Sequence, residues 1–407
     1  MIQNAENKRI GESKISVPLL YTFAYMAIGS FTPYIAPYLE TLGFSGAHIG
    51  TVTSAGTTMA IFAVAFWGGV YSKFTERKTG SAGTRNALLL AGLCIGAVIV
   101  AACIKQALLF GVVICLFALL YFLQPPAISL IDAFAVSGRN AEGDKGFGGK
   151  RAWGAVGFAL GVFVGGRAAG KTYEGIIFYI YMACFLITAC VLLYIAFRRK
   201  AEGSGPLKPH AKAEENTGSY RKLLHDKQVC RLLLCMFFMG GTNVANNTYF
   251  SFLYIEGGGT LAGVGIVMLL MVGSEVPFMA WCDWLAEKFT LQKTILFAML
   301  ISSARFILYG IGLPWWMLVL LFFTQGAVNG IILVEFVRYI SRIAPPGCKS
   351  LAVSAYYVIG SNISTIVCQF VGGLLLDGFG ADGVYMFFGL FNLTGTILYM
   401  IFGLHRS

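Results

Sequence analysis

Long apolar segments separated by short polar loops make up almost the whole chain. Each segment holds roughly 20 mostly apolar residues, which is enough for one helix to cross a bilayer core of about 30 Å. The strands of a membrane barrel would instead alternate over about 10 residues, and this chain does not show that pattern. About twelve segments have the length of a spanning helix. They cover residues 17–40, 46–71, 86–104, 107–136, 151–170, 175–197, 228–255, 260–284, 292–312, 315–340, 350–376 and 381–403.

The one long polar stretch lies between the sixth and seventh segments, from Arg198 to Leu223. It contains GSGPLKPHAKAEENTG, in which Gly, Pro and mixed charges replace apolar residues. This composition is typical of a flexible linker. The sequence therefore predicts an all-α polytopic membrane protein with twelve transmembrane helices in two pseudo-symmetric six-helix bundles. We place these bundles at residues 1–197 and 224–407, and the linker at 198–223.

Composition and charge support this class. Hydrophobic residues make up 57% of the chain and charged residues 12%, whereas soluble domains carry about 25% charged residues. The net charge of +11 does not indicate nucleic-acid binding, because the basic residues alternate between loops and do not gather on one face. One set of alternate loops holds nearly all of them, and the opposite loops hold only Lys105, Arg167 and Lys171. By the positive-inside rule, both termini and the linker are expected in the cytoplasm of a cell-membrane protein.

The sequence gives no indication of a cofactor or of an enzyme. Its ten cysteines lie in or beside apolar segments without a CxxC pair, and its four histidines lie in loops or at segment ends. These residues predict neither a haem nor a zinc site. HExxH, nucleophile-and-base and phosphate-loop motifs are also missing. We therefore expect no cofactor and no catalytic activity, and a chain that acts as a monomer.

Ionisable residues inside apolar segments are costly in a bilayer, so each is a functional-site hypothesis. Asp132 ends the fourth segment and Arg151 begins the fifth, so they could pair. Alternatively, both lie at the membrane surface, where the stem of an arginine extends to water. Glu275 lies about midway along the eighth segment and Arg305 lies within the ninth.

Other polar residues in the segments have two possible roles. Asn243, Asn246 and Asn247 could bind a polar solute or link helices, and the sequence leaves both open. Glu335 and Arg338 are three residues apart and share a helix face, which favours a surface ion pair. The remaining polar positions are expected to have structural or solvated roles. They are Gln124 beside the prolines 125 and 126, where a kink would free backbone carbonyls, and Glu40 and Glu256 at external segment ends.

Small residues at helical spacing predict close helix packing. Gly154, Gly157, Gly161 and Gly165 form such a face on the fifth segment. Gly50 with Ser54, and Gly360 with Ser361 and Ser364, could do the same on segments two and eleven.

Five motifs in sequence order carry a resemblance to a known family. They are WGGVYSKF from Trp67, FGGKRAWGAVGFALG from Phe147, SEVPFMAWCDWLAEKF from Ser274, ARFILYGIG from Ala304 and VEFVRYI from Val334. Together with the two-bundle layout, they resemble the lactose permease branch of the major facilitator superfamily, which includes sugar and nucleoside permeases. In that fold the substrate site lies between the two halves near the bilayer midplane.

The resemblance implies roles for several residues. Asp132 matches an acidic sugar-binding residue, Arg151 its partner, and Phe158 an aromatic residue that stacks on the sugar ring. Glu275 and Arg305 match acidic and basic residues of helices eight and nine, and we assign them to proton coupling. Asn243, Asn247 and Gln325 complete the expected substrate site.

This sequence also departs from the pattern. Phe322, Gln325 and Val328 stand where the lactose permeases carry Lys, His and Glu, and Ser72 stands where the superfamily usually has Asp. The proton route of the lactose permease is therefore missing from segment ten. The expected function is a proton-coupled symporter of a small polar organic solute, of the sugar or nucleoside class, driven by a proton or cation gradient. The alternative is an efflux antiporter of the same fold for drugs or metabolites, and the buried arginines count against it.

Overall fold

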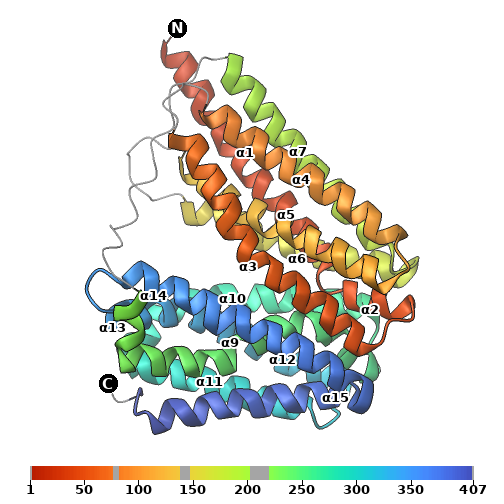
Figure 1. The fold of residues 1–407 in the computed structure, drawn as a ribbon, viewed down its shortest axis with the longest axis vertical. Helices are drawn as coiled ribbons and strands as arrows, with labels where there is room; N and C mark the ends of the chain where they lie inside the picture. Colours follow the sequence, from red (N-terminus) through yellow and green to blue (C-terminus); the bar gives the residue numbers. More distant parts are fainter. Residues whose placement is uncertain (1, 77–81, 138–146, 202–219, 406–407) are drawn as a thin grey trace. The chain divides into compact units, whose positions relative to one another are not determined.

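The computed structural model describes residues 2–76, 82–137, 147–201 and 220–405. Within these ranges every regular element is a helix, as Figure 1 shows. The elements are α1 (Ile2–Phe31), α2 (Ile35–Thr41), α3 (Gly46–Glu76), α4 (Ala82–Gln106), α5 (Phe110–Ser137), α6 (Phe147–Lys171), α7 (Ile176–Ala201), α8 (Tyr220–His225), α9 (Lys227–Glu256), α10 (Leu261–Phe289), α11 (Leu291–Tyr309), α12 (Trp315–Ile331), η1 (Ile332–Phe336), α13 (Val337–Ile343), α14 (Lys349–Ala355), η2 (Tyr356–Ile363) and α15 (Ser364–Ile401).

Each of the predicted apolar segments corresponds to one helix or to a short series of helices. Nine helices in the described part are long and apolar enough to cross a membrane. The tenth predicted segment is divided into α12, the π-helix η1 and α13. The eleventh predicted segment comprises α14, η2 and the first part of α15, and the twelfth follows it in α15 after a break at Gly380, where φ is 65° and ψ is −170°. The linker predicted at 198–223 falls largely on residues 202–219, which lie outside the described ranges.

The chain separates by backbone contacts into two compact units. The first comprises Met1–Thr32 with Met59–Ala211, and the second comprises Pro33–Thr58 with Lys212–Ser407. Helix α3 therefore belongs to the second unit through its first turns and to the first unit through the rest. The sequence did not predict this division of one helix.

In the first unit, α1 packs closely on the glycine face of α6. A Cβ atom at Gly161 would come within 2.9 Å of the Met26 backbone, and one at Gly157 would meet the backbone of Thr22 in the same way. The ring of Tyr25 covers Gly154. The predicted packing face is therefore confirmed at Gly154, Gly157 and Gly161, because only glycine allows the two backbones to lie so close.

Helix α5 contains the two adjacent prolines 125 and 126. Pro126 has no N–H to bond the carbonyl of Phe122 four residues earlier. The indole Nε1 of Trp67 on α3 donates to this carbonyl at 3.0 Å. The preceding Gln124 is buried and accepts a hydrogen bond from the Tyr181 hydroxyl at 2.9 Å. Helix α3 thus satisfies the backbone carbonyl that Pro126 frees, as membrane burial requires.

In the second unit, α9 packs along α15 and η2. Gly240 of α9 lies against the backbone of Gly360 in η2, and Gly241 lies against Ser364. The side-chain hydroxyl of Ser364 accepts from the Gly241 amide at 2.9 Å. The small residues predicted on segment eleven therefore mark a close helix contact.

The first turn of α3 also packs on α15 within the second unit. Gly50 and Gly373 face each other, and a Cβ atom at either position would come within 3.0 Å of the opposite Cα atom. At the end of this contact, the carboxylate of Asp377 accepts from the backbone amides of Gly46 at 2.5 Å and Ala47 at 2.8 Å. An acidic side chain at a helix N-terminus satisfies free amides and interacts favourably with the helix dipole.

Candidate functional site

In the first unit, the predicted sugar-binding residue Asp132 lies half-buried near the end of α5. Its Oδ1 accepts a hydrogen bond from the Tyr21 hydroxyl of α1 at 2.7 Å. The predicted partner Arg151 belongs to α6, but its side chain lies outside the described part of the structure. Phe158 is half-buried on the same helix. The pairing of Asp132 with Arg151 and the stacking role of Phe158 therefore stay predictions.

In the second unit, Arg305 of α11 is 1% exposed. Its Nη2 donates to Asn243 Oδ1 of α9 at 3.3 Å, and its guanidinium lies 4.5 Å from the ring centre of Phe306. Nε and Nη1 are buried and have no hydrogen-bond partner among the described residues. A buried arginine with two unsatisfied donors is expensive, so Arg305 stays a candidate for a functional role.

Two aromatic contacts show at which level of the second unit Asn247 and Gln325 lie relative to Arg305. The rings of Phe250 on α9 and Phe322 on α12 lie 4.1 Å apart, and Phe250 also lies 6.4 Å from Tyr309 on α11. Asn247 precedes Phe250 by three residues, and Gln325 follows Phe322 by three. Because α9 and α12 run in opposite directions, Asn247 and Gln325 lie about one turn below the aromatic contact, at the level of Arg305.

Asn247 and Gln325 both carry unsatisfied acceptors. Gln325 is 1% exposed and donates from Nε2 to Asn329 Oδ1 at 3.4 Å. Its Oε1 and the Oδ1 of Asn247 are buried and accept no hydrogen bond from any described residue. We call Arg305, Asn243, Asn247 and Gln325 the polar cluster of the second unit. The structure thus joins Arg305 and Asn243 by a hydrogen bond, and places Asn247 and Gln325 at the same level on the neighbouring helices.

The second unit also contains a second set of buried polar contacts, and of its residues the sequence analysis named only Asn246. The Tyr385 hydroxyl donates to Asn246 Oδ1 at 2.8 Å, and Ser303 and Thr396 share a hydrogen bond of 3.0 Å. Asn392 Nδ2 donates to the Thr242 hydroxyl. Asn392 and Thr396 are four residues apart in an apolar segment, and this helical spacing was the available signal.

Glu275 lies half-buried on α10. The preceding residue, Ser274, packs against Gly326 of α12, where a Cβ atom would come within 2.9 Å of the Glu275 amide nitrogen. In the described part of the chain, Glu275 and Arg305 do not form an ion pair in this conformation. The role of both residues in proton coupling stays a prediction.

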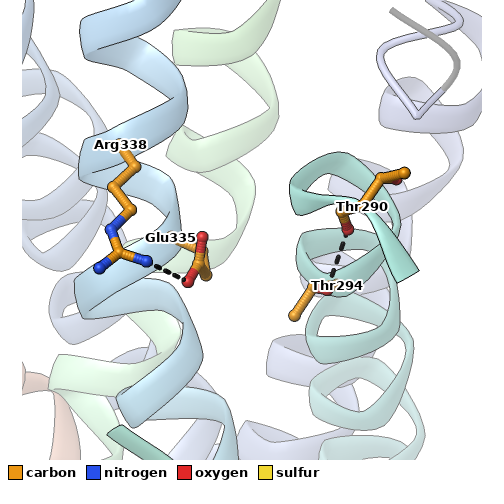
Figure 2. Close-up of polar contacts among 4 residues, drawn as sticks. All are labelled: Thr290, Thr294, Glu335 and Arg338. Carbon is orange, nitrogen blue, oxygen red and sulfur yellow. Dashed lines mark hydrogen bonds and ion pairs between the residues drawn. The ribbon is translucent and has the colours of Figure 1, made fainter. Parts of the chain in front are cut away.

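The structure corrects the interpretation of Glu335 and Arg338 as a surface pair. Figure 2 shows the ion pair, with Arg338 Nη1 and Glu335 Oε1 3.0 Å apart. The side chain of Arg338 is 42% exposed, but that of Glu335 is 0% exposed. The error arose because helix spacing predicts which residues share a face and does not predict how deeply that face is buried.

Glu256, expected to be solvated, is exposed and also has a structural contact. Its carboxylate accepts from the Ala381 amide at 3.1 Å, directly after the break at Gly380. Elsewhere, the described residues contain no group of three His, Cys, Asp or Glu side chains that could hold a metal ion.

Comparison with known proteins decides the family. The model described as "MFS_1 like family" matches residues 14–387. The chain belongs to this family of major facilitator transporters. It is a multi-pass transporter of the cell membrane and not an enzyme.

Two relatives extend over nearly the whole chain of this facilitator. A maltose permease of Geobacillus stearothermophilus is 30% identical over 399 residues, which are 95% of this chain and 94% of the relative. The uncharacterized transporter YwbF of Bacillus subtilis (strain 168) is 28% identical over 376 residues, covering 92% and 90% of the two chains. Among solved structures, the nucleoside transporter NupG matches with a TM-score of 0.76 at 18% identity, covering 96% of this chain and 98% of that one. This last likeness concerns the fold alone.

Proposed function

We propose that this facilitator is a proton-coupled symporter of a small, neutral, polyhydroxylated solute of the sugar or nucleoside class. In the first unit, Asp132, Arg151 and Phe158 would contact the solute. Asn243, Asn247 and Gln325 would contribute from the second unit. The maltose permease relative supports the sugar class.

The observation that carries this proposal is the chemistry of the unsatisfied atoms in the polar cluster. Arg305 offers two N–H donors, whereas Asn247 and Gln325 offer two oxygen acceptors. A hydroxyl group both donates and accepts hydrogen bonds, so neighbouring hydroxyls could satisfy all four atoms. A carboxylate only accepts, and would leave the two amide oxygens unsatisfied. The cluster therefore favours a polyol over an organic acid.

The unsatisfied atoms of the polar cluster are buried in this conformation, although Asn243 and Asn247 are partly exposed. A solute could reach these atoms only when α9, α11 and α12 separate locally. We propose that this opening is part of alternating access. When the solute leaves, Glu275 would approach Arg305, and the contact would drive release of the proton that Glu275 carried.

A panel of binding measurements on the purified full chain tests the proposed preference for neutral polyols. Maltose and uridine represent neutral polyols, and gluconate represents a polyol with a carboxylate. We expect calorimetric binding of at least one neutral compound, and at least tenfold weaker binding of that compound to Arg305→Lys, because a lysine cannot present a planar pair of donors. Arg167→Lys, at an exposed position, is the matched control. Binding of gluconate alone, or equal binding to Arg305→Lys and wild type, would contradict the proposal.

A further inference from the structure

The short helix α8 carries basic residues at one end of the second unit. Its six residues are YRKLLH, and Arg221 and Lys222 are exposed. Leu223 between them and the next helix is 0% exposed, and belongs to one hydrophobic core cluster with Ile340 and Cys348. A helix of this length is not stable by itself in water, so its contact with the core holds it in place. Helix α8 therefore presents its charged side chains from a fixed position.

Lys222 connects α8 with the segment between α13 and α14. Its Nζ donates to the Pro346 carbonyl oxygen at 3.5 Å. Arg342 precedes Pro346 by four residues and Lys349 follows it by three, and both side chains are exposed. The buried residues of this segment belong to the same core cluster as Leu223, so the segment and α8 share one support. We call Lys222, Arg342 and Lys349 the basic rim of the second unit.

Among the described residues, no acidic side chain forms an ion pair with the basic rim. Asp226, directly after α8, is half-buried, and its Oδ1 accepts from the amides of Gln228 and Val229. Glu335 is 0% exposed and pairs with Arg338. The acidic side chains at the end of α10 lie outside the described part. The described surface around the rim thus has one sign of charge, which attracts an anionic group.

The outer face of α9 shows at which depth of the bilayer this end of the unit lies. Lys227 and Arg231 are exposed on this face, and Leu234, one turn further along the helix, is also exposed. A change from charged to apolar surface within one turn is typical of the boundary between lipid headgroups and acyl chains. Leu224 of α8, which precedes Lys227 by three residues, is 55% exposed. Cations beside an exposed apolar side chain favour a lipid over a soluble anion.

We propose that the basic rim binds the phosphate of an anionic phospholipid, with phosphatidylglycerol as the simplest case. The loop charges predict that this end of the second unit is cytoplasmic, and the cytoplasmic leaflet carries a negative surface potential. The ammonium group of Lys222 has three donors, of which the Pro346 carbonyl takes one. The guanidinium of Arg342 can bind a phosphate through two parallel hydrogen bonds. A phosphate bound there links α8 with the segment between α13 and α14.

The first test measures affinity and does not depend on transport. Native mass spectrometry follows the full chain during titration with phosphatidylglycerol or with zwitterionic phosphatidylcholine, and we expect tighter binding of phosphatidylglycerol. One basic residue near an anionic surface contributes about fivefold in affinity. Lys222→Gln combined with Lys349→Gln should therefore weaken phosphatidylglycerol binding at least tenfold, whereas Lys222→Arg with Lys349→Arg should stay within about twofold of wild type. Equal binding by wild type and the glutamine variant would overturn the proposal.

The second test determines where the lipid binds and whether the ligand is a lipid. Phosphatidylglycerol with a photoreactive headgroup, in nanodiscs that contain the full chain, should label residues 220–231 and 342–349. The matched control is Arg167→Gln with Lys171→Gln, two exposed positions of the first unit, and it should keep the labelling. Labelling that inorganic phosphate removes at the concentration of the lipid would show a site for a free anion. Labelling spread evenly over all exposed loops would show attraction to the membrane surface alone, and either result would overturn the proposal.

Discussion

Two buried amides of the second unit, Gln325 and Asn246, allow the ligand role proposed for Gln325 to be tested against a structural one. The Oε1 of Gln325 has no partner among the described residues, whereas the Oδ1 of Asn246 accepts from Tyr385. Gln325→Leu removes an unsatisfied acceptor, so the empty carrier should become more stable by about 1 kcal/mol. The same variant should bind maltose or uridine more weakly. Thermal unfolding in detergent, together with calorimetry, measures both effects.

Asn246→Leu is the matched control for this prediction. It leaves the buried Tyr385 hydroxyl without its acceptor, and should lower the unfolding free energy by about 1 to 3 kcal/mol. If Gln325→Leu destabilises the protein as strongly as Asn246→Leu, Gln325 has a structural role and the ligand interpretation is wrong.

A second prediction at the residue scale concerns Glu275. The side chain of Gln has the size of Glu but cannot take up or release a proton. Glu275→Gln should therefore abolish accumulation of solute under a proton gradient, and leave exchange across the membrane largely intact. Radiolabelled uptake and counterflow in the same vesicles measure the two activities, with Glu40→Gln as the control. Accumulation by Glu275→Gln would remove this residue from the coupling role.

At the scale of elements, the contact between α3 and α15 depends on glycine. A Cβ atom at Gly373 would come within 2.8 Å of the Gly50 Cα atom and would clash with the Gly46 carbonyl. Gly373→Ala should therefore push the first turns of α3 away from α15 and break the cap that Asp377 forms on the Gly46 amide. Spin labels at Ala47 and Gly378 should report a longer distance in this variant. Gly111→Ala is the control, because nothing lies within 4 Å of its Cβ position, and an unchanged distance in Gly373→Ala would contradict the prediction.

The junction of α10 and α11 is strained. Thr290 has a φ of 67°, which is unfavourable for a β-branched residue, and Figure 2 shows its carbonyl accepting from Thr294 Oγ1 at 3.0 Å. Thr290→Gly should relieve this strain and stabilise the protein by about 1 kcal/mol. The midpoint of thermal unfolding measures this change in stability. A midpoint lower than that of wild type would show that the Thr290 side chain stabilises the protein by more than its strained backbone destabilises it. Thr294→Gly, at a helical position, should be destabilising.

The elements themselves were largely predictable, because an apolar run of about 20 residues has one stable conformation in a bilayer. The two π-helices were not predictable. Residues 332–336 and 356–363 have the same apolar character as the helices around them, so their register depends on packing and not on composition. A loop was expected between the predicted segments 350–376 and 381–403. In the structure the helical conformation is interrupted there at Gly380.

At the scale of the whole molecule, the sequence predicted the helical class, and its motifs led to the correct superfamily. Its predicted boundary between halves, at 198–223, stays a prediction. The assignment of Pro33–Thr58 to the second unit could not be predicted, because the contact of Gly50 with Gly373 joins residues far apart in the chain. The depth of Glu335 was missed for a related reason, since burial in a bundle depends on neighbours that the linear pattern does not identify.

The central claim is that this protein couples the movement of a neutral polyol to a proton gradient. The most direct measurement is uptake of radiolabelled maltose into proteoliposomes that contain the wild-type chain, with an acidic exterior and an alkaline interior. The account predicts that the internal maltose concentration rises above the external one. An ionophore that collapses the proton gradient should make the two concentrations equal again. Maltose that only equilibrates, with or without the gradient, would contradict the claim.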